Sequence, residues 1–216
     1  MGFFMRISKS GLAILLSKLA HFEKPRADME QYPTDSETAA EMLWEAFMNS
    51  DIKGKIVADL GCGTGILGIG ALLLGAERVI FVEKDQNALK ILRENIELAE
   101  RLSGIKIFQK AEIICSDIRD ANISADCVVQ NPPFGVQNRH ADRTFLETAF
   151  KIAPVIYSIH KEESNNFIKR LTEANSFKIA GHIIIELPIK KSMPHHMKRI
   201  YKFKAGIWKL QKEELA

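Results

Sequence analysis

The sequence predicts an α/β fold with a seven-stranded, mostly parallel sheet, helices on both faces of that sheet and a C-terminal antiparallel hairpin. From about residue 50 onward, short apolar runs alternate with longer stretches of helical periodicity, which is typical of parallel βαβ units. A glycine-rich turn joins the first apolar run to the helical stretch after it. The last two apolar runs follow each other without a helical stretch between them, which indicates an antiparallel pair.

The first half of the sheet comes from four short apolar runs. The strands predicted there are, in chain order, Lys55–Leu60, Arg78–Glu83, Glu112–Ser116 and Asp126–Gln130. A helix from about Ile66 to Leu74 follows the first strand. A second helix begins at Asp85, after which apolar residues recur near helical spacing.

The second half of the chain completes the sheet. The elements predicted there are the helix Thr144–Ile152, the strand Val155–His160, the helix Glu162–Ala174 and the strands Lys178–Leu187 and Lys198–Leu210. We expect one domain over residues 1–216. It consists of a helical N-terminal segment (1–50), the βα units that carry the site (51–175) and the closing hairpin (176–216).

The composition is that of an ordinary globular protein, with 216 residues of which 46% are hydrophobic and 26% are charged. The apolar run Gly11–Leu16 is much shorter than a membrane-spanning helix, so we expect neither membrane insertion nor secretion. The cysteines Cys62, Cys115 and Cys127 are too widely spaced for a disulfide framework or a zinc motif. We therefore expect a reducing, cytoplasmic location and no bound metal.

The turn after the first strand reads DLGCGTGILG, from Asp59 to Gly68. Glycines at such a turn allow a ligand to approach the backbone closely at the N-terminus of the following helix. Gly63, Gly65 and Gly68 match the spacing of a dinucleotide fingerprint, which by itself is weak evidence. Asp59 precedes the glycines, in a position to hold a cationic amino group, and this feature points away from NAD.

Acidic residues stand at the ends of three successive predicted strands. Glu83 could accept hydrogen bonds from ribose hydroxyls, and Asp117 could accept one from an adenine amino group. Because the carboxyl ends of parallel strands meet at one edge of the sheet, these three acids favour a nucleotide-binding site. The alternative, in which each acid only caps the following helix, is less favoured.

The fourth strand ends in ADCVVQNPPFG, with Asn131, Pro132, Pro133 and Phe134 in succession. Two consecutive prolines stop strand pairing, remove two N–H donors and leave carbonyl groups that can only accept. An amide oxygen and a carbonyl held beside an aromatic ring are suited to a flat group that carries N–H donors. A rigid loop without chemistry is the alternative that Pro-Pro alone would favour.

These segments resemble the S-adenosylmethionine-dependent methyltransferases, and more closely the small NPPF-type ribosomal-RNA adenine-N6 methyltransferases of archaea and eukaryotes. The resemblance runs roughly from Phe22 to Lys161 and rests on FEKPRADMEQYPTDSETAAEML, DLGCGTG, NPPFG and YSIHK. It implies a Rossmann-like class I methyltransferase fold, with S-adenosyl-L-methionine as cofactor. It also implies that the segment before the first strand closes over this methyl donor.

The residues expected to contact the methyl donor follow from the glycine turn, the strand-end acids and the motif positions of this family. They are Gln31, Thr34, Asp59, Gly61, Gly63, Thr64, Gly65, Ile66, Glu83, Asp117 and Ile118.

The expected catalytic residues are Asn131, Pro132, Pro133 and Phe134. If the Asn131 side-chain oxygen and the Pro132 carbonyl each accept one N–H of an adenine N6 amine, the nitrogen lone pair is steered toward the sulfonium methyl group. Alignment then replaces a strong general base, and Phe134 offers a stacking face for the adenine ring.

RNA is the expected partner, and an adenine inside a duplex must be flipped or single-stranded to reach such a pocket. Residues 1–186 hold 22 Lys and Arg against 25 Asp and Glu, whereas residues 187–216 hold 8 against 2. A phosphate-contacting strip and a solvated face both explain this basic tail. The residues expected to contact nucleic acid are Arg139, His160, Lys161, Lys198, Arg199, Lys202 and Lys204.

Other functions remain open from the sequence. A glutamine side-chain amide would fit the same acceptors, so protein glutamine-N5 methylation is an alternative, although that branch usually carries Tyr where Phe134 stands. DNA adenine-N6 methylation and a non-catalytic role in ribosome assembly are the others.

The third strand is expected at an edge of the sheet, and the segment Ile105–Cys115 is apolar for an edge. Members of the resembled family pair with a small zinc-binding activator protein that adds a strand there, which implies the same partner for this chain. A loop folded over the edge is the alternative.

Changing Lys198, Arg199, Lys202 and Lys204 to alanine tests the basic tail. If these side chains bind phosphates, the affinity for RNA should fall. The slope of log affinity against log salt should also become shallower by about 0.7 for each phosphate that is no longer neutralised on single-stranded RNA. Filter binding at several salt concentrations measures both, and an unchanged slope would identify the four residues as a solvated face.

Overall fold

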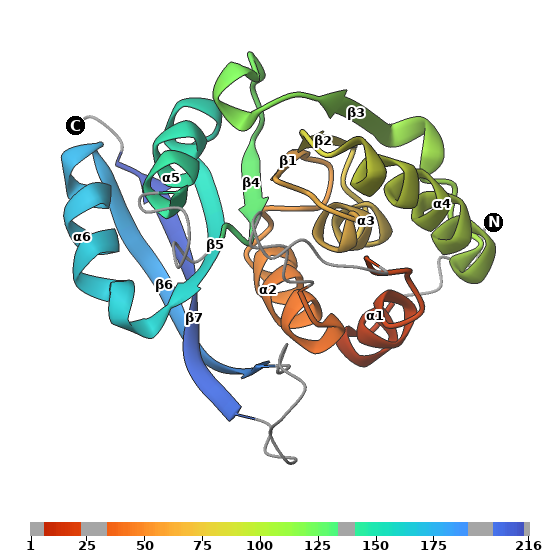
Figure 1. Ribbon diagram of the computed structural model, residues 1–216, viewed down its shortest axis with the longest axis horizontal. Helices are drawn as coiled ribbons and strands as arrows, with labels where there is room; N and C mark the ends of the chain where they lie inside the picture. The colour runs from red at the N-terminus through yellow and green to blue at the C-terminus, as the bar shows by residue number, and fades with distance from the viewer. Residues whose placement is uncertain (1–6, 23–33, 134–140, 190–200, 214–216) are drawn as a thin grey trace.

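The computed structural model describes residues 7–22, 34–133, 141–189 and 201–213, and its centre is one seven-stranded sheet (Figure 1). The strand order is β3-β2-β1-β4-β5-β7-β6. Neighbouring strands from β3 to β5 are parallel, whereas β7 runs antiparallel to both β5 and β6. The strands are β1 Ile56–Leu60, β2 Arg78–Glu83, β3 Ala111–Cys115, β4 Cys127–Gln130, β5 Val155–Lys161, β6 Phe177–Ile189 and β7 Tyr201–Lys212. The predicted fold class is confirmed, with the closing hairpin and with β3 at an edge.

Helices cover both faces of this sheet, as predicted. They are α1 Lys9–Leu16, α2 Ser36–Met48, α3 Ile66–Leu73, α4 Gln86–Ser103, α5 Ala141–Ile152 and α6 Asn165–Ala174. One core cluster joins α1 to α4 with one face of the sheet, and a second joins α5 and α6 with the other face. Short 3-10 turns lie at Phe108–Lys110, Ile118–Asp120 and Glu162–Ser164. The helix predicted from Glu162 therefore begins as a 3-10 turn.

The two core clusters explain why the central strands are apolar at nearly every position. In β2, Val79 and Phe81 belong to the first cluster, whereas Ile80 and Val82 belong to the second. All four are at most 3% exposed, because successive side chains of a strand point to opposite faces and both faces are covered. Among the described residues, no helix is long and apolar enough to cross a membrane.

The parallel register places the ends of the central strands together. Leu60 at the end of β1 lies opposite Val82 of β2 and Gln130 of β4. The turn after β1 is tied to β2, because the N–H groups of Gly61 and Cys62 both donate to the carbonyl of Val82, at 2.9 and 3.1 Å. The glycine turn and the NPP segment (Asn131–Pro133) therefore leave the sheet at neighbouring points, where the parallel strands have their carboxyl ends.

Candidate active site

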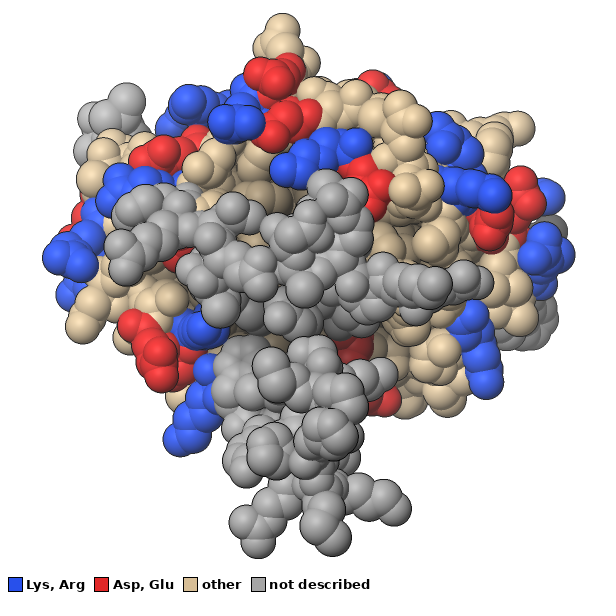
Figure 2. All heavy atoms as spheres, viewed as in Figure 1, with Lys and Arg blue, Asp and Glu red and all other residues tan. Residues whose placement is uncertain are grey.

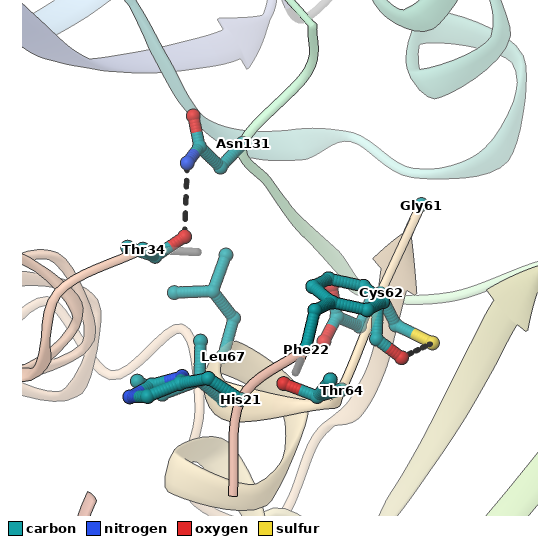
Figure 3. A pocket seen from close by; sticks show the side chains of 11 residues that line it. His21, Phe22, Thr34, Gly61, Cys62, Thr64, Leu67 and Asn131 are labelled. Atoms are coloured by element: carbon teal, nitrogen blue, oxygen red, sulfur yellow. Dashed lines mark hydrogen bonds between the residues drawn. The ribbon is translucent and has the colours of Figure 1, made fainter. Parts of the chain in front are cut away.

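A pocket lies at this edge of the sheet, between the glycine turn and the end of β4 (Figure 3). Seven residues singled out in the sequence line it: Thr34, Asp59, Gly61, Gly63, Thr64, Ile66 and Asn131. Four further lining residues were missed: His21, Phe22, Cys62 and Leu67. The structure thus brings a residue expected to act in catalysis together with most of the residues expected to contact the donor.

The glycine turn adopts a backbone that other residues rarely tolerate. Gly61, Gly63 and Gly65 have φ angles of 64°, 53° and 90°, in the left-handed region. A Cβ at Gly65 would also lie 2.1 Å from Leu92 Cδ1, so α4 packs directly against the turn. A Cβ at Gly61 would lie 2.7 Å from the ring of Phe145, so α5 closes the turn from the other side.

Asp59 lies at the end of β1, is 1% exposed and lines the pocket. Its Oδ2 accepts a hydrogen bond of 2.8 Å from the backbone N–H of Gly68 in α3. Burial raises the pKa of Asp59 to about 7, against the opposing effect of the Gly68 hydrogen bond, and the charge of Glu83 adds to the rise. A cationic group placed beside Asp59 would therefore favour its carboxylate form.

Glu83 organises the turn rather than standing free. Its Oε2 accepts from the N–H of Gly63 at 3.1 Å, and its Oε1 accepts from the N–H groups of Lys84 and Asp85 at 2.8 and 2.9 Å. Three backbone donors thus hold this carboxylate beside the glycine turn.

Four of the expected donor-contacting residues do not line the described pocket. Gly65 is the N-cap of α3, and Glu83 accepts hydrogen bonds from the backbone of the turn. Asp117 pairs with Arg119, 2.9 Å between Oδ1 and Nε, and this partner lowers the pKa of its carboxyl group. Ile118 is buried in the 3-10 turn that follows. Gln31 lies outside the described residues.

The Asn131 side chain is the chemically distinctive group of the pocket. Its Nδ2 donates to Thr34 Oγ1 at 2.9 Å, as Figure 3 shows. Its Oδ1 is buried and accepts no hydrogen bond from the part of the chain that the structure describes. Because an unpaired buried acceptor is costly, this oxygen is suited to a ligand that brings an N–H donor. Pro132 is buried and Pro133 half-buried beside it, and Phe134 lies outside the described residues.

Asn95 is a second polar residue that the sequence interpretation missed. It lies on the buried face of α4, where its Oδ1 accepts from Ala20 N at 2.7 Å. Its Nδ2 donates to the carbonyls of Ala20 and Thr64, each at 2.9 Å. It therefore joins the glycine turn to the segment that leads into His21 and Phe22. The sequence signal is an asparagine among the apolar positions of an amphipathic helix.

The structure contradicts the expectation that His160 contacts nucleic acid. The side chain is 1% exposed, and its Nε2 lies 2.7 Å from Ser158 Oγ. Burial lowers the pKa of His160 to about 3, so the ring is neutral. The reason is tertiary: β7 pairs with β5 and sets Gly206 opposite His160, and the Trp208 ring packs edge-on against the imidazole.

Among the other residues expected to contact RNA, Lys161 and Lys204 lie at neighbouring positions, because Lys161 pairs with Ala205. Lys161 is half-buried at the end of β5, and Lys204 is exposed on β7. Lys202 lies in β7, and its side chain is not described. Arg139, Lys198 and Arg199 lie outside the described residues. Figure 2 shows basic and acidic side chains interspersed around the rim of this face.

Glu83→Ala should weaken the binding of S-adenosylmethionine by about tenfold or more, because three backbone N–H groups beside the turn lose their acceptor. Titration calorimetry measures the affinity. Glu97→Ala is the matched control, since Glu97 is an exposed acid on α4 whose partner is Arg101. Equal affinities for the two variants would contradict the role of Glu83.

The pH dependence of donor binding tests Asp59, whose pKa is about 7. As pH falls below that value, Asp59 becomes neutral and can no longer pair with the amino group of the donor. Affinity should then fall by up to about tenfold per pH unit. Asp59→Asn should bind weakly and without this dependence. Calorimetry from pH 5.5 to 7 measures both proteins, and a flat profile for the unaltered chain would rule the pairing out.

Comparisons with known proteins agree with this geometry. The family model described as Methyltransferase small domain matches residues 34–154. The rRNA N(6)-adenosine-methyltransferase METTL5 of Danio rerio is 38% identical over 175 residues, which cover 80% of this chain and 82% of that protein. A solved structure from Pyrococcus horikoshii, described as a candidate RNA methyltransferase, is 40% identical, with a TM-score of 0.84 and coverage of 94% and 98%.

A more distant structure shares the fold alone. The magnesium protoporphyrin IX methyltransferase of Synechocystis PCC 6803, solved with bound S-adenosylmethionine, has a TM-score of 0.63 at 14% identity and covers 82% of this chain and 79% of its own. The glycine turn and the buried carboxyl group of Asp59, which both line the pocket, fit S-adenosylmethionine. The chain belongs to the small-domain family of class I S-adenosyl-L-methionine-dependent methyltransferases, in the branch of the NPPF-type ribosomal-RNA adenine-N6 methyltransferases.

Proposed function

We propose that this chain methylates the N6 amine of an adenine in RNA, and specifically in small-subunit ribosomal RNA. The observation that carries the proposal is Asn131 Oδ1, a buried acceptor at the pocket that no donor in the described chain satisfies. The name of the Danio rerio relative, an rRNA N6-adenosine-methyltransferase, supports the same substrate. S-Adenosylmethionine, when bound, supplies an electrophilic methyl group.

The proposed role of the NPP segment is alignment of the amine. Asn131 Oδ1 and the Pro132 carbonyl would each accept one N–H of N6, and these two bonds would strengthen as positive charge develops on nitrogen. Ladder pairing of β4 ends at Gln130, which supports an unpaired Pro132 carbonyl. Pro133 would keep the direction of that carbonyl, and Phe134 would stack on the base. The proton can leave after methyl transfer, so no strong base is required.

The proposed donor-binding set consists of the glycine turn together with the acids at the ends of the first three strands. Asp59 would hold the amino group, the glycine turn would approach the donor with its backbone, and Glu83 would accept from the ribose hydroxyls. Asp117 and Ile118 would contact the adenine. We place this activity in the cytoplasm, a location that the free thiols of all three cysteines support.

Tritiated S-adenosylmethionine incubated with ribosomal RNA, with DNA or with a release factor tests the substrate class. We expect label in adenine N6 of ribosomal RNA. Label in DNA would instead indicate DNA adenine-N6 methylation, and label in the release factor would indicate glutamine-N5 methylation. No transfer to any of them by the chain together with any protein that co-purifies with it would indicate a non-catalytic role.

Asn131→Ala should abolish methyl transfer, with a loss of about 100-fold or more, because the amine loses an aligning acceptor. Donor affinity should remain nearly unchanged, since the donor is held chiefly by the ends of the first three strands. Asn175→Ala is a suitable control. Within the described residues, the Asn175 side chain donates one hydrogen bond, to the carbonyl of Leu171 in the preceding helix turn. An active Asn131→Ala protein would show that the alignment role is wrong.

We also propose that a small zinc-binding activator protein pairs with the β3 edge. The edge position of β3 supports this, as do the exposed side chains of Leu102 and Phe108 nearby, which are 45% and 51% exposed. A partner strand would satisfy the free edge groups and cover this apolar surface.

Ile113→Pro should remove a backbone donor of β3, and Phe108→Asp should place a charge on the proposed contact surface. Both should reduce recovery of a small zinc protein in co-purification from the native organism. Ile184→Asp is the matched control, because Ile184 is 59% exposed on β6 at the opposite edge of the sheet. An active, monodisperse chain that purifies without a companion would contradict the proposal.

A further inference from the structure

Thr34 and Asn131 form a direct contact between two distant parts of the chain. The residues are 97 positions apart, and Asn131 Nδ2 donates to Thr34 Oγ1 at 2.9 Å. Thr34 is 9% exposed, and this hydrogen bond is partly buried. From this contact we infer that Thr34 is a positioning residue, which sets the orientation of the Asn131 amide toward the substrate amine. The inference rests on the proposed function.

The need for such a residue follows from the chemistry of a side-chain amide. Its two ends have nearly the same size, but one is an acceptor and the other carries two donors. An Asn131 amide rotated by half a turn would present N–H groups to a substrate nitrogen that itself carries two N–H groups. With Nδ2 engaged by Thr34, Oδ1 is the end that stays unpaired within the described chain.

Thr34 is held rigidly enough to serve this purpose. The next residue, Asp35, caps α2, because its Oδ1 accepts from Thr38 N at 3.0 Å and its Oδ2 from Thr38 Oγ1 at 2.6 Å. Helix α2 is in turn packed between α1 and α3 in the core of the first face. The position of the threonine hydroxyl is therefore set by the start of a buried helix.

Two other roles for Thr34 make different predictions. A donor contact, which the family resemblance implies, would appear as weaker binding of S-adenosylmethionine. A role confined to supporting α2 would appear as a lower melting temperature. A positioning role would lower the methyl-transfer rate at saturating substrates, and a serine would restore that rate because it keeps the hydroxyl.

The test compares Thr34→Val, which keeps the shape but lacks the hydroxyl, with Thr34→Ser. Thr172→Val is the matched control, since Thr172 is 1% exposed and bonds Ile168 O on α6, a helix that does not line the pocket. Single-turnover methyl transfer to ribosomal RNA gives the rate, calorimetry gives the donor affinity, and NMR of the Asn131 side-chain amide reports its hydrogen bond. The Asn131 signal is assigned by its disappearance in Asn131→Ala.

We expect Thr34→Val to lower the rate by about tenfold or more while the donor affinity changes by less than about twofold. Its Asn131 amide protons should shift and lose their protection from exchange. Thr34→Ser should lie within about threefold of the unaltered rate and keep the amide signal, and Thr172→Val should leave both unchanged.

An unaltered rate with an unaltered Asn131 signal in Thr34→Val would overturn the inference. So would a loss that appears entirely in donor affinity or that Thr34→Ser fails to restore. If the unaltered chain methylates no RNA, the proposed function fails, and the NMR comparison decides the contact by itself. A changed Asn131 signal in Thr34→Val, retained in Thr34→Ser, then supports the positioning role, and an unchanged signal in Thr34→Val overturns it.

Discussion

Parallel pairing of β1 with β2 on one side and with β4 on the other is the constraint on which the site depends. In this register Leu60 lies opposite both Val82 and Gln130, so three chain segments leave the sheet at one edge. A slip of one residue in either pairing would turn each side chain of the shifted strand to the opposite face. Asp59 and Asn131 could not then line the same pocket. The apolar cores on the two faces oppose such a slip, because the buried apolar side chains of the central strands each belong to one of them.

Polar groups buried around the pocket divide into two kinds. Asp59 and Asn95 direct their side chains to backbone groups of the protein itself, and in doing so they fix the glycine turn against α3, α4 and the segment at Ala20. Asn131 instead keeps one buried oxygen without a donor in the described chain. An acceptor held in place in this way costs stability when alone and requires little reorganisation when an amine arrives.

The C-terminal hairpin supports the site from behind. Gln130, next to Asn131, donates from Nε2 to Ser158 Oγ at 3.0 Å, and Ser158 in turn contacts His160. These three buried side chains run from the end of β4 into β5, where β7 covers them with Trp208. The basic hairpin is therefore built into the core through its inward-facing residues, whereas Lys204 on β7 remains exposed. Strand β7 thus contributes to the packing behind the NPP segment and also carries positive charge on its outer surface.

Local patterns in the sequence determined the fold class, the order of the elements, the glycine turn and the NPP end of β4, because alternation, helical spacing and Gly and Pro act over a few residues. The family resemblance likewise depends on contiguous motifs. Only the tertiary structure decided that His160 is buried, since its neighbour β7 lies about 45 residues further along the chain. The same holds for Thr34 beside Asn131 and for Asn95 beside Ala20 and Thr64. Such contacts join positions far apart in sequence, and no local preference of either partner reveals them.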